Sequence, residues 1–320
     1  MPSVTLSRGR HKGWDAWFLR HGRLTLILVP QVGGRVMGAL WRGHDLFFTQ
    51  PEREGVVEDV DAVTDVGARK TVMGFPLWGG DKTWLGPQEC WTLGVPFLEL
   101  DSGPYTLSVD RETPDEVSLR MTSVIDRETG VRVERELSVA AESPGWSMTH
   151  RLLNVSAETV EWGLWDVAMV CKPGRVYLPR ASASRYPSGV KTFEDEGDSA
   201  ALRDDVVGEL GGLAVVRHDD HRKYKYGVDA AEGWMLGVFE TDGGLVGYCK
   251  QAAGPPGRRY PHGCTAEVFN SDRYPYMEME LLGPVAELAP GGSVELRERQ
   301  ALFDVATWPV DEAAVRRLVV

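Results

Sequence analysis

The sequence predicts an all-β protein, a large antiparallel β-sandwich, and three observations support this fold class. Nearly every readable segment alternates apolar and polar side chains with the period of two that a half-buried strand requires. These segments are divided by turns rich in glycine and proline, of which the chain has 36 and 19. The alternating series of helices that a βαβ fold needs is not seen. Because no linker-like break in composition occurs, we expect one domain over residues 1–320.

Strand patterns can be read along the whole chain. The two runs that alternate most strictly are residues 116–124 and 131–139, and the turn between them ends at Gly130, as expected for a hairpin. A polar turn after Asn154 predicts a second hairpin. The expected strands are residues 23–30, 35–41, 116–124, 131–139, 146–153, 160–170, 234–240, 245–250, 265–269, 276–282 and 293–303.

Only two helices are expected. One lies within residues 198–210, inside an acidic stretch flanked by glycines, and the other is a short C-terminal helix over residues 311–318. Both are short additions to the predicted sandwich.

Composition and charge exclude several classes of function. The chain has 47 acidic and 35 basic residues and a net charge of −12, which argues against a nucleic-acid binder and against an anionic membrane surface. No targeting pattern is visible, and the apolar run 24–29 is far shorter than the roughly 20 residues that span a bilayer. The four cysteines are scattered and form no CxxC pair. We therefore expect reduced thiols and a cytoplasmic protein, with two disulfides as the less favoured alternative.

Two segments carry polar side chains that regular structure does not need. Residues 79–91 bring together Lys82, Trp84 and Gln88 in a segment that also holds two glycines and a Gly-Pro pair. Such a set suits a polyhydroxylated ligand, because sugar rings stack on aromatic faces and hydroxyls need donors and acceptors. A structural loop anchored by tryptophan is the alternative. Asp166 lies within an otherwise apolar run, where a carboxylate is costly unless it is hydrogen-bonded or faces a cavity.

A third segment, residues 276–282, places two carboxylates side by side. With a period of two, Tyr276, Glu278 and Glu280 share one face of a strand, and methionines occupy the other face. In a cleft the two carboxylates would repel each other and raise one pKa, which prepares a general acid or base. A solvated strand face is the alternative.

No metal ion and no organic cofactor is expected. His218 and His221 enclose two aspartates, but the arginine and lysine neighbours of this segment oppose cation binding. The chain has no nucleophile elbow, P-loop or dinucleotide fingerprint. The expected partner is a small molecule, and the oligomeric state is left open.

Taken in order, several segments resemble the galactose mutarotase-like (aldose 1-epimerase) superfamily, most closely a bacterial branch of unassigned activity. The resemblance covers most of the chain, from about residue 20 to residue 303. The matching segments are Pro30-Gln-Val-Gly-Gly-Arg-Val, Gly43-His-Asp-Leu-Phe, Gly79-Gly-Asp-Lys-Thr-Trp with Pro87-Gln, Asn154 leading to Trp165-Asp166, Glu267, Tyr276-Met-Glu-Met-Glu-Leu-Leu-Gly-Pro and Leu288-Ala-Pro-Gly-Gly.

The resemblance implies a β-supersandwich with a concave sheet that binds a sugar. In the family, a glutamate on a strand shortly before a Leu-x-Pro-Gly turn is the base that acts on the anomeric hydroxyl. Glu280, eight residues before Leu288, matches this glutamate best, and Glu278 is the neighbouring candidate.

The histidine that serves as the acid in this family has no counterpart here. The corresponding positions hold Trp165-Asp166 and residues 81–84. Lys82 or Asp166 would therefore have to donate the proton, or the reaction differs. The contacts to the substrate would come from Arg35, Trp84, Gln88, Trp165, Glu267 and Tyr276.

The leading hypothesis is a sugar-active enzyme of carbohydrate metabolism, an aldose epimerase-like isomerase that uses neither metal nor nucleotide. Two alternatives stay open. One is a non-catalytic carbohydrate-binding protein with the same cleft, and the other is an enzyme that performs elimination or cyclisation on another polar metabolite. The missing histidines shift weight toward these alternatives.

Overall fold

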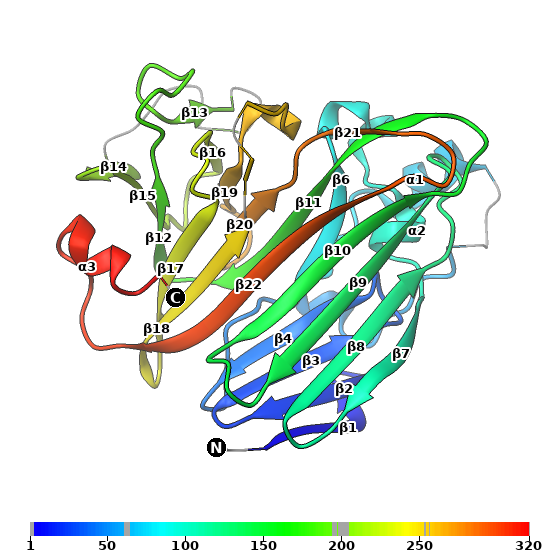
Figure 1. Cartoon of the computed structure of the whole chain (residues 1–320), viewed down its shortest axis with the longest axis horizontal. Helices are drawn as coiled ribbons and strands as arrows, with labels where there is room; N and C mark the ends of the chain where they lie inside the picture. The colour runs from blue at the N-terminus through cyan, green and yellow to red at the C-terminus, as the bar shows by residue number, and fades with distance from the viewer. Residues whose placement is uncertain are drawn as a thin grey trace.

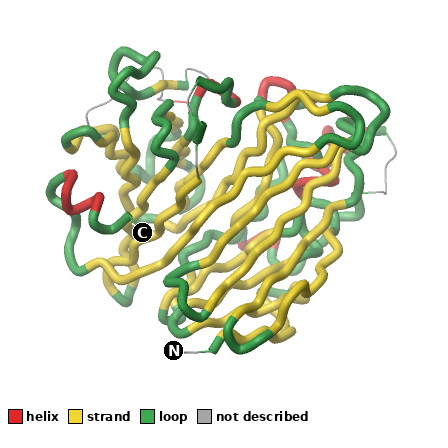
Figure 2. Tube along the Cα trace, viewed as in Figure 1, coloured by secondary structure: helices red, strands yellow, loops and turns green. Residues whose placement is uncertain are grey.

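Two large antiparallel sheets make up most of the protein. The structure, a computed structural model, describes residues 3–60, 65–193, 197, 205–252, 254–255 and 257–319. Within these residues the regular structure is almost entirely strand, and the helices are short (Figures 1 and 2). The predicted all-β fold class is confirmed.

One sheet contains twelve of the described strands, and its central strands carry the candidate site. Its order is β1-β2-β3-β4-β6-β11-β20-β19-β16-β13, with β5 paired to β4 and β21 paired to β11. The bounds are β1 Val4–His11, β2 Trp14–His21, β3 Leu24–Val29, β4 Arg35–Trp41, β5 His44–Asp45, β6 Asp81–Gly86, β11 Val160–Cys171, β13 Lys191–Thr192, β16 Tyr224–Val228, β19 Ala266–Asn270, β20 Tyr276–Leu282 and β21 Ala286–Leu288.

The second sheet has ten described strands and packs its inner face against the first. Its order is β14-β15-β12-β17-β18-β22-β10-β9-β8-β7. The bounds are β7 Tyr105–Glu112, β8 Glu116–Ser123, β9 Val131–Ala140, β10 Trp146–Asn154, β12 Gly174–Pro179, β14 Val207–Leu210, β15 Leu213–Arg217, β17 Trp234–Thr241, β18 Gly244–Ala252 and β22 Ser293–Val305.

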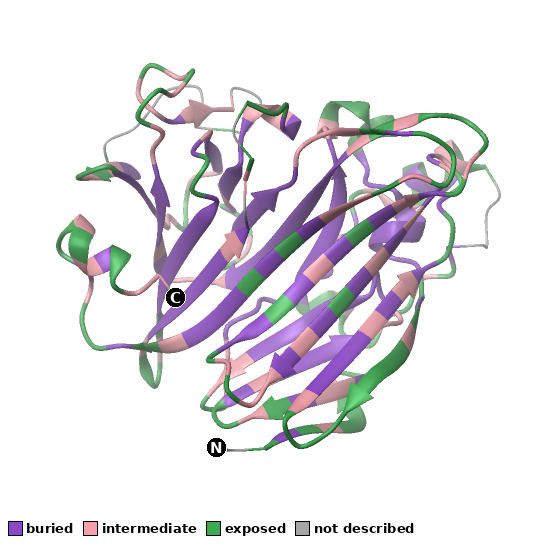
Figure 3. Cartoon of the chain, viewed as in Figure 1, coloured by how far each residue is buried: buried purple, intermediate pink, exposed green. Residues whose placement is uncertain are grey.

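The second sheet shows the alternation that the sequence predicts. Along β9 every second residue from Val131 to Val139 is buried, and the residues between them are partly or fully exposed. The same banding runs along the neighbouring strands in Figure 3. In the twelve-stranded sheet, by contrast, β6 and β20 are buried at every position, so both faces of these central strands are covered.

The helices differ from the prediction in part. Residues 198–204 of the expected internal helix lie outside the described residues, and Val207–Leu210 is the strand β14, because it completes a hairpin with β15. Two helices that were not predicted, α1 (Val66–Met73) and α2 (Leu98–Asp101), precede β7. The C-terminal helix is confirmed as α3 (Glu312–Arg316). In the described part of the chain no helix has the length and apolar character needed to cross a bilayer.

The register of the central strands places charged side chains in one row across the sheet. Lys82 on β6 pairs with Val167 on β11, which pairs with Glu280 on β20, which in turn pairs with Glu267 on β19. Residues in register share a face of a sheet. Glu278, two positions before Glu280, lies on that same face, and the fold thus gathers a lysine and three glutamates from the three strands β6, β20 and β19.

Candidate functional site

A pocket of about 450 Å³ lies over the outer face of the twelve-stranded sheet, above β6, β11, β20, β19 and β16. This volume is in the range that holds small-molecule ligands. Five of the residues predicted from the sequence line it, namely Trp84, Gln88, Trp165, Tyr276 and Glu278. The prediction therefore finds about half of the expected site on the pocket wall.

Two tryptophans form the floor of the pocket. Trp84 and Trp165 are register partners on β6 and β11, and their rings meet edge to face with centroids 5.1 Å apart. Trp91 packs against both rings. Trp165 is only 1% exposed and Trp84 5% exposed, so they offer a ligand little more than their rims.

A lysine–glutamate pair stands at one side of this floor. Lys82 Nζ lies 3.1 Å from Glu278 Oε1 and 4.2 Å from the ring centroid of Trp84. Burial lowers the pKa of Lys82, an effect that the carboxylate of Glu278 opposes. Glu278 lines the pocket and keeps 10% of its side chain exposed. A carboxylate that a ligand can reach is thus backed by a buried lysine.

Glu280 lies beneath the pocket and is fully buried. Its Oε2 accepts hydrogen bonds from Trp165 Nε1 at 2.8 Å and from Lys225 Nζ at 3.0 Å. Burial raises the pKa of Glu280 to about 8; the lysine opposes this rise, and the neighbouring carboxylates of Glu267 and Glu278 add to it. Near neutral pH the Glu280 carboxyl is therefore mostly protonated, which is the state that a general acid needs.

Glu267 shares the same lysine but stays ionised. Its Oε2 lies 2.8 Å from Lys225 Nζ, and its Oε1 lies 3.1 Å from His262 Nδ1. Burial alone would raise the pKa of Glu267, but Lys225 and His262 together lower it to about 2. One buried lysine between two carboxylates thus favours the ionised form of Glu267 and leaves Glu280 as the group that holds a proton.

A histidine does reach the edge of the site, from a loop rather than a strand. His262 lies in the turn Pro261–Gly263 with φ 54°, and its ring centroid is 4.8 Å from that of Trp165. Its Nε2 accepts a hydrogen bond from the backbone N–H of Gln88 at 2.9 Å, while Nδ1 bonds to Glu267. Both ring nitrogens are therefore engaged, so this histidine holds the loops and Glu267 in place.

Two predicted residues do not reach the pocket. Asp166 is next to Trp165 on β11 and therefore points to the opposite face, into the space between the sheets, where it bonds to Lys250 of β18. Arg35 is fully buried and donates to Asp101 Oδ1 at 2.6 Å and to the carbonyl of Gly79 at 3.0 Å. The expectation that Asp166 and Arg35 face a ligand is corrected by this geometry.

Two others, Lys82 and Glu280, lie directly under the lining residues, and Glu267 lies beside them. These three contact Trp84, Trp165 and Lys225, which line the pocket. They can act on a ligand only through those neighbours or through a small rearrangement.

Several lining residues were not predicted. Lys225 is the most important of them, because it joins Glu267 to Glu280 and lies 4.5 Å from the Trp165 ring centroid. A signal was present, since Lys225 stands in the middle of the apolar run Tyr224–Val228, where an unpaired charge would be costly. The other unpredicted lining residues include Phe75, Lys223, Phe269, Arg273 and Tyr274.

The chemistry of the site follows from the ion pairs between its glutamates and lysines. The glutamates that the strands bring to the pocket are held by lysine ammonium groups, Glu278 by Lys82 and the other two by Lys225. The arrangement suits proton transfer and hydrogen bonding to hydroxyl groups, beside an aromatic floor.

Comparison with solved structures shows which proteins have a fold similar to that of this chain. The "putative aldose 1-epimerase" of Klebsiella pneumoniae matches with a TM-score of 0.63 at 13% identity, covering 99% of this chain and 87% of that one. A galactose mutarotase-like protein of Clostridium acetobutylicum matches with a TM-score of 0.56 at 9% identity, covering 95% and 99%. A TPR-domain containing protein of Parabacteroides distasonis matches with a TM-score of 0.59 at 13% identity. This match includes 93% of the present chain but only 49% of that protein, so the chain spans about half of its length.

At such identities the likeness shows the fold alone, and this fold is the one that the resemblance in the sequence implies. No curated protein sequence matches the chain. The family model described as a domain of unknown function, DUF4380, matches residues 104–303, well over half of the sequence. The chain, which has the galactose mutarotase-like fold, therefore belongs to the DUF4380 family.

Proposed function

We propose that this protein binds a sugar, or a similar polyhydroxylated small molecule, in the pocket above β6, β11 and β20 and transfers protons to and from it, as an epimerase does. The observation that carries the proposal is the placement of two lysine–glutamate groups around one tryptophan floor. One group ends in a carboxylate on the pocket wall, and the other contains a carboxyl that is protonated near neutral pH.

The roles follow from exposure and protonation. Glu278, which lines the pocket, is the base that takes a proton from a ligand hydroxyl. Glu280 is the proton reservoir, because its pKa of about 8 leaves it mostly protonated at pH 7. Lys225 lines the pocket and donates to Glu280 Oε2, so its ammonium group gives a proton to a ligand oxygen and takes the replacement from the Glu280 carboxyl. Gln88 and Tyr276, also on the wall, supply hydrogen bonds to hydroxyls.

A panel of reducing sugars, followed by NMR for exchange between α and β anomers, tests the proposal. Exchange faster than in buffer, abolished in Glu278→Gln and kept in Glu240→Gln, is the expected result. Glu240 is an exposed glutamate on β17 and serves as the matched control. Binding without exchange refutes the base role of Glu278, and the absence of both refutes the proposal as a whole.

One observation favours a second function, a carbohydrate-binding protein without catalysis. Both nitrogens of His262 are engaged, so no histidine in the described part of the site stands ready as a free acid. If this second function holds, sugars quench the fluorescence of the buried tryptophans in the parent protein, and anomer exchange is no faster than in buffer. A change of affinity in Glu280→Gln, with no exchange in either protein, would leave Glu280 as a binding group.

A further inference from the structure

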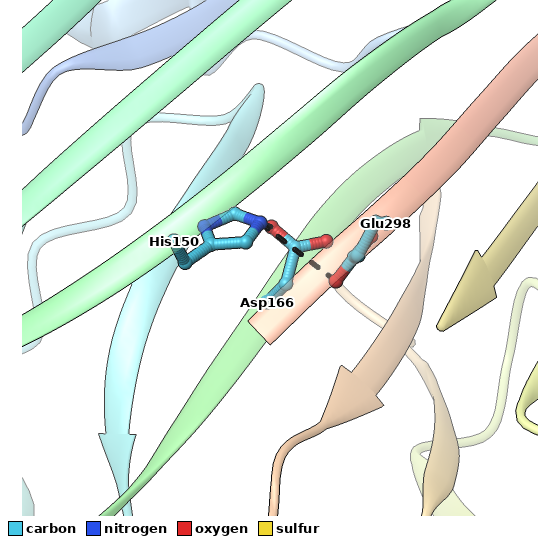
Figure 4. Close-up of side chains that lie close together, drawn as sticks. All are labelled: His150, Asp166 and Glu298. Carbon is cyan, nitrogen blue, oxygen red and sulfur yellow. Dashed lines mark ion pairs between the residues drawn. The ribbon is translucent and has the colours of Figure 1, made fainter. Parts of the chain in front are cut away.

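A second group of charged residues lies between the two sheets, on the opposite face of β11 from the pocket. Asp166 comes from β11 of one sheet, and His150 and Glu298 come from the adjacent strands β10 and β22 of the other (Figure 4). All three side chains are completely buried. One ligand atom of each lies within 4.8 Å of the others. This group is independent of the pocket and of its proposed chemistry.

In each of these residues one polar atom is held and the other is open. His150 Nδ1 bonds to Thr83 Oγ1 at 2.7 Å, and Glu298 Oε2 accepts from Gln300 Nε2 at 3.0 Å. The corresponding oxygen of Asp166, Oδ2, accepts from Lys250. By contrast, His150 Nε2, Asp166 Oδ1 and Glu298 Oε1 have no hydrogen-bond partner among the described residues, and Arg135 Nη2 lies 3.8 Å from Asp166 Oδ1, beyond hydrogen-bond distance. Three open atoms that point at one another, each oriented by a partner on its far side, are the usual arrangement of metal ligands.

Two of the distances between these atoms indicate what fits between them. His150 Nε2 lies 3.5 Å from Asp166 Oδ1 and 3.7 Å from Glu298 Oε1, too long for direct hydrogen bonds. A water at about 2.8 Å from each atom would have to bond at angles of roughly 77° and 83°, far from tetrahedral. For an ion at about 2.1 Å from each atom, the ligand–ion–ligand angles for the same two pairs would be roughly 113° and 123°, close to the angles of a tetrahedral metal site.

The charge of the cluster leaves room for a cation. The carboxylates Asp81, Asp166 and Glu298 face two cations, Arg135 and Lys250, so the cluster lacks one positive charge. A proton would supply that charge, but it joins one donor to one acceptor and leaves one of the three open atoms unpaired. A divalent ion leaves an excess of one positive charge, equal in size to the deficit that it replaces, and it engages all three atoms.

We propose that His150, Asp166 and Glu298 bind a divalent transition-metal ion, with Zn²⁺ as the best fit, and that this ion cross-links the two sheets. One imidazole nitrogen with two carboxylate oxygens is a donor set that Zn²⁺ accepts readily. Because the site is enclosed, the ion enters during folding and has a structural role. With the proton on Nδ1, His150 donates to Thr83 and presents the Nε2 lone pair to the ion.

The test uses the full-length protein refolded from denaturant, once with stoichiometric Zn²⁺ and once with a chelator, followed by desalting. We expect about one equivalent of bound zinc by elemental analysis, and a Tm several degrees higher for the zinc-loaded protein. Glu298→Gln, which keeps the size of the side chain and an oxygen for Gln300, should lose at least tenfold in zinc affinity. His221→Gln is the matched control, since His221 is exposed and should leave zinc binding unchanged.

Crystals of the zinc-loaded parent protein provide a measurement that does not depend on any variant folding. An anomalous difference peak at the zinc edge between His150, Asp166 and Glu298 is the expected result. A peak elsewhere, retained zinc below a tenth of an equivalent, or identical Tm values with zinc and with chelator would each overturn the proposal. In the last two cases the cluster holds a proton instead.

Discussion

Replacing Lys225 with methionine tests the electrostatics of the candidate site most directly. The ammonium group of Lys225 lies 2.8 Å from Glu267 Oε2 and 3.0 Å from Glu280 Oε2, and its side chain is only 5% exposed. Methionine fills the same space without a charge. The substitution therefore leaves two buried carboxylates that face each other without their shared cation.

The expected cost is large, because removal of one partner from a buried ion pair destabilises by about 3–5 kcal/mol. For a chain of this size, that corresponds to a fall in Tm on the order of 10 °C. The cost should depend on pH. In the parent, the pKa of Glu280 is raised to about 8, so the stability contributed by this group is present at low pH and is lost as pH rises through 8. Without the lysine, the pKa values of Glu280 and Glu267 both rise, so the loss becomes steeper.

Thermal denaturation of Lys225→Met at pH 5 and pH 8 measures this effect. We expect a larger fall in Tm at pH 8, and partial recovery in the double variant Lys225→Met/Glu267→Gln, which removes one of the two carboxyl groups. Lys12→Met is the control, because Lys12 is exposed and its ion pair with Glu54 should contribute less than about 1 kcal/mol. A fall in Tm equal to that of the control, or one independent of pH, would refute the reasoning.

Three further predictions concern the fold. Burial raises the pKa of Asp45 to about 6, so its contribution to stability is lost as pH rises from about 4 to 6. The Tm of Asp45→Asn should therefore be higher than that of the parent at pH 7 but not at pH 4. The same difference in Tm at both pH values would contradict this prediction. Met279→Ala, at a fully buried position between the sheets, should lower the unfolding free energy by about 2–5 kcal/mol in urea titrations. Gly33→Ala should be much more destabilising than Gly43→Ala, although both glycines have positive φ. A Cβ at Gly33 would lie 2.0 Å from the carbonyl oxygen of Asp101, whereas apart from its chain neighbours no described atom lies within 4 Å of a Cβ at Gly43. Similar midpoints of urea unfolding for the two variants would contradict this prediction.

The strand period accounts for the part of the site that the sequence predicted well. Alternation places Glu278 and Glu280 on one face of β20 and Lys82 and Trp84 on one face of β6 whatever the partners of these strands. The same rule could have excluded Asp166, since it directly follows Trp165 and the two must point to opposite faces. The cost of a carboxylate in this apolar strand is offset by its bond to Lys250 between the sheets and not by a ligand.

What the amino-acid sequence determined by itself is the set of strands, the side-chain face within each strand and the acidic charge of the chain. These are local properties, fixed by backbone geometry and composition. Only the tertiary structure decided that Lys225 would stand between two glutamates, that a loop would bring His262 against Trp165, and that three distant residues would meet between the sheets. Such long-range contacts depend on which strands pair and which loops cover them. The pairing of strands is set by the free energy of the whole chain and not by that of any one segment.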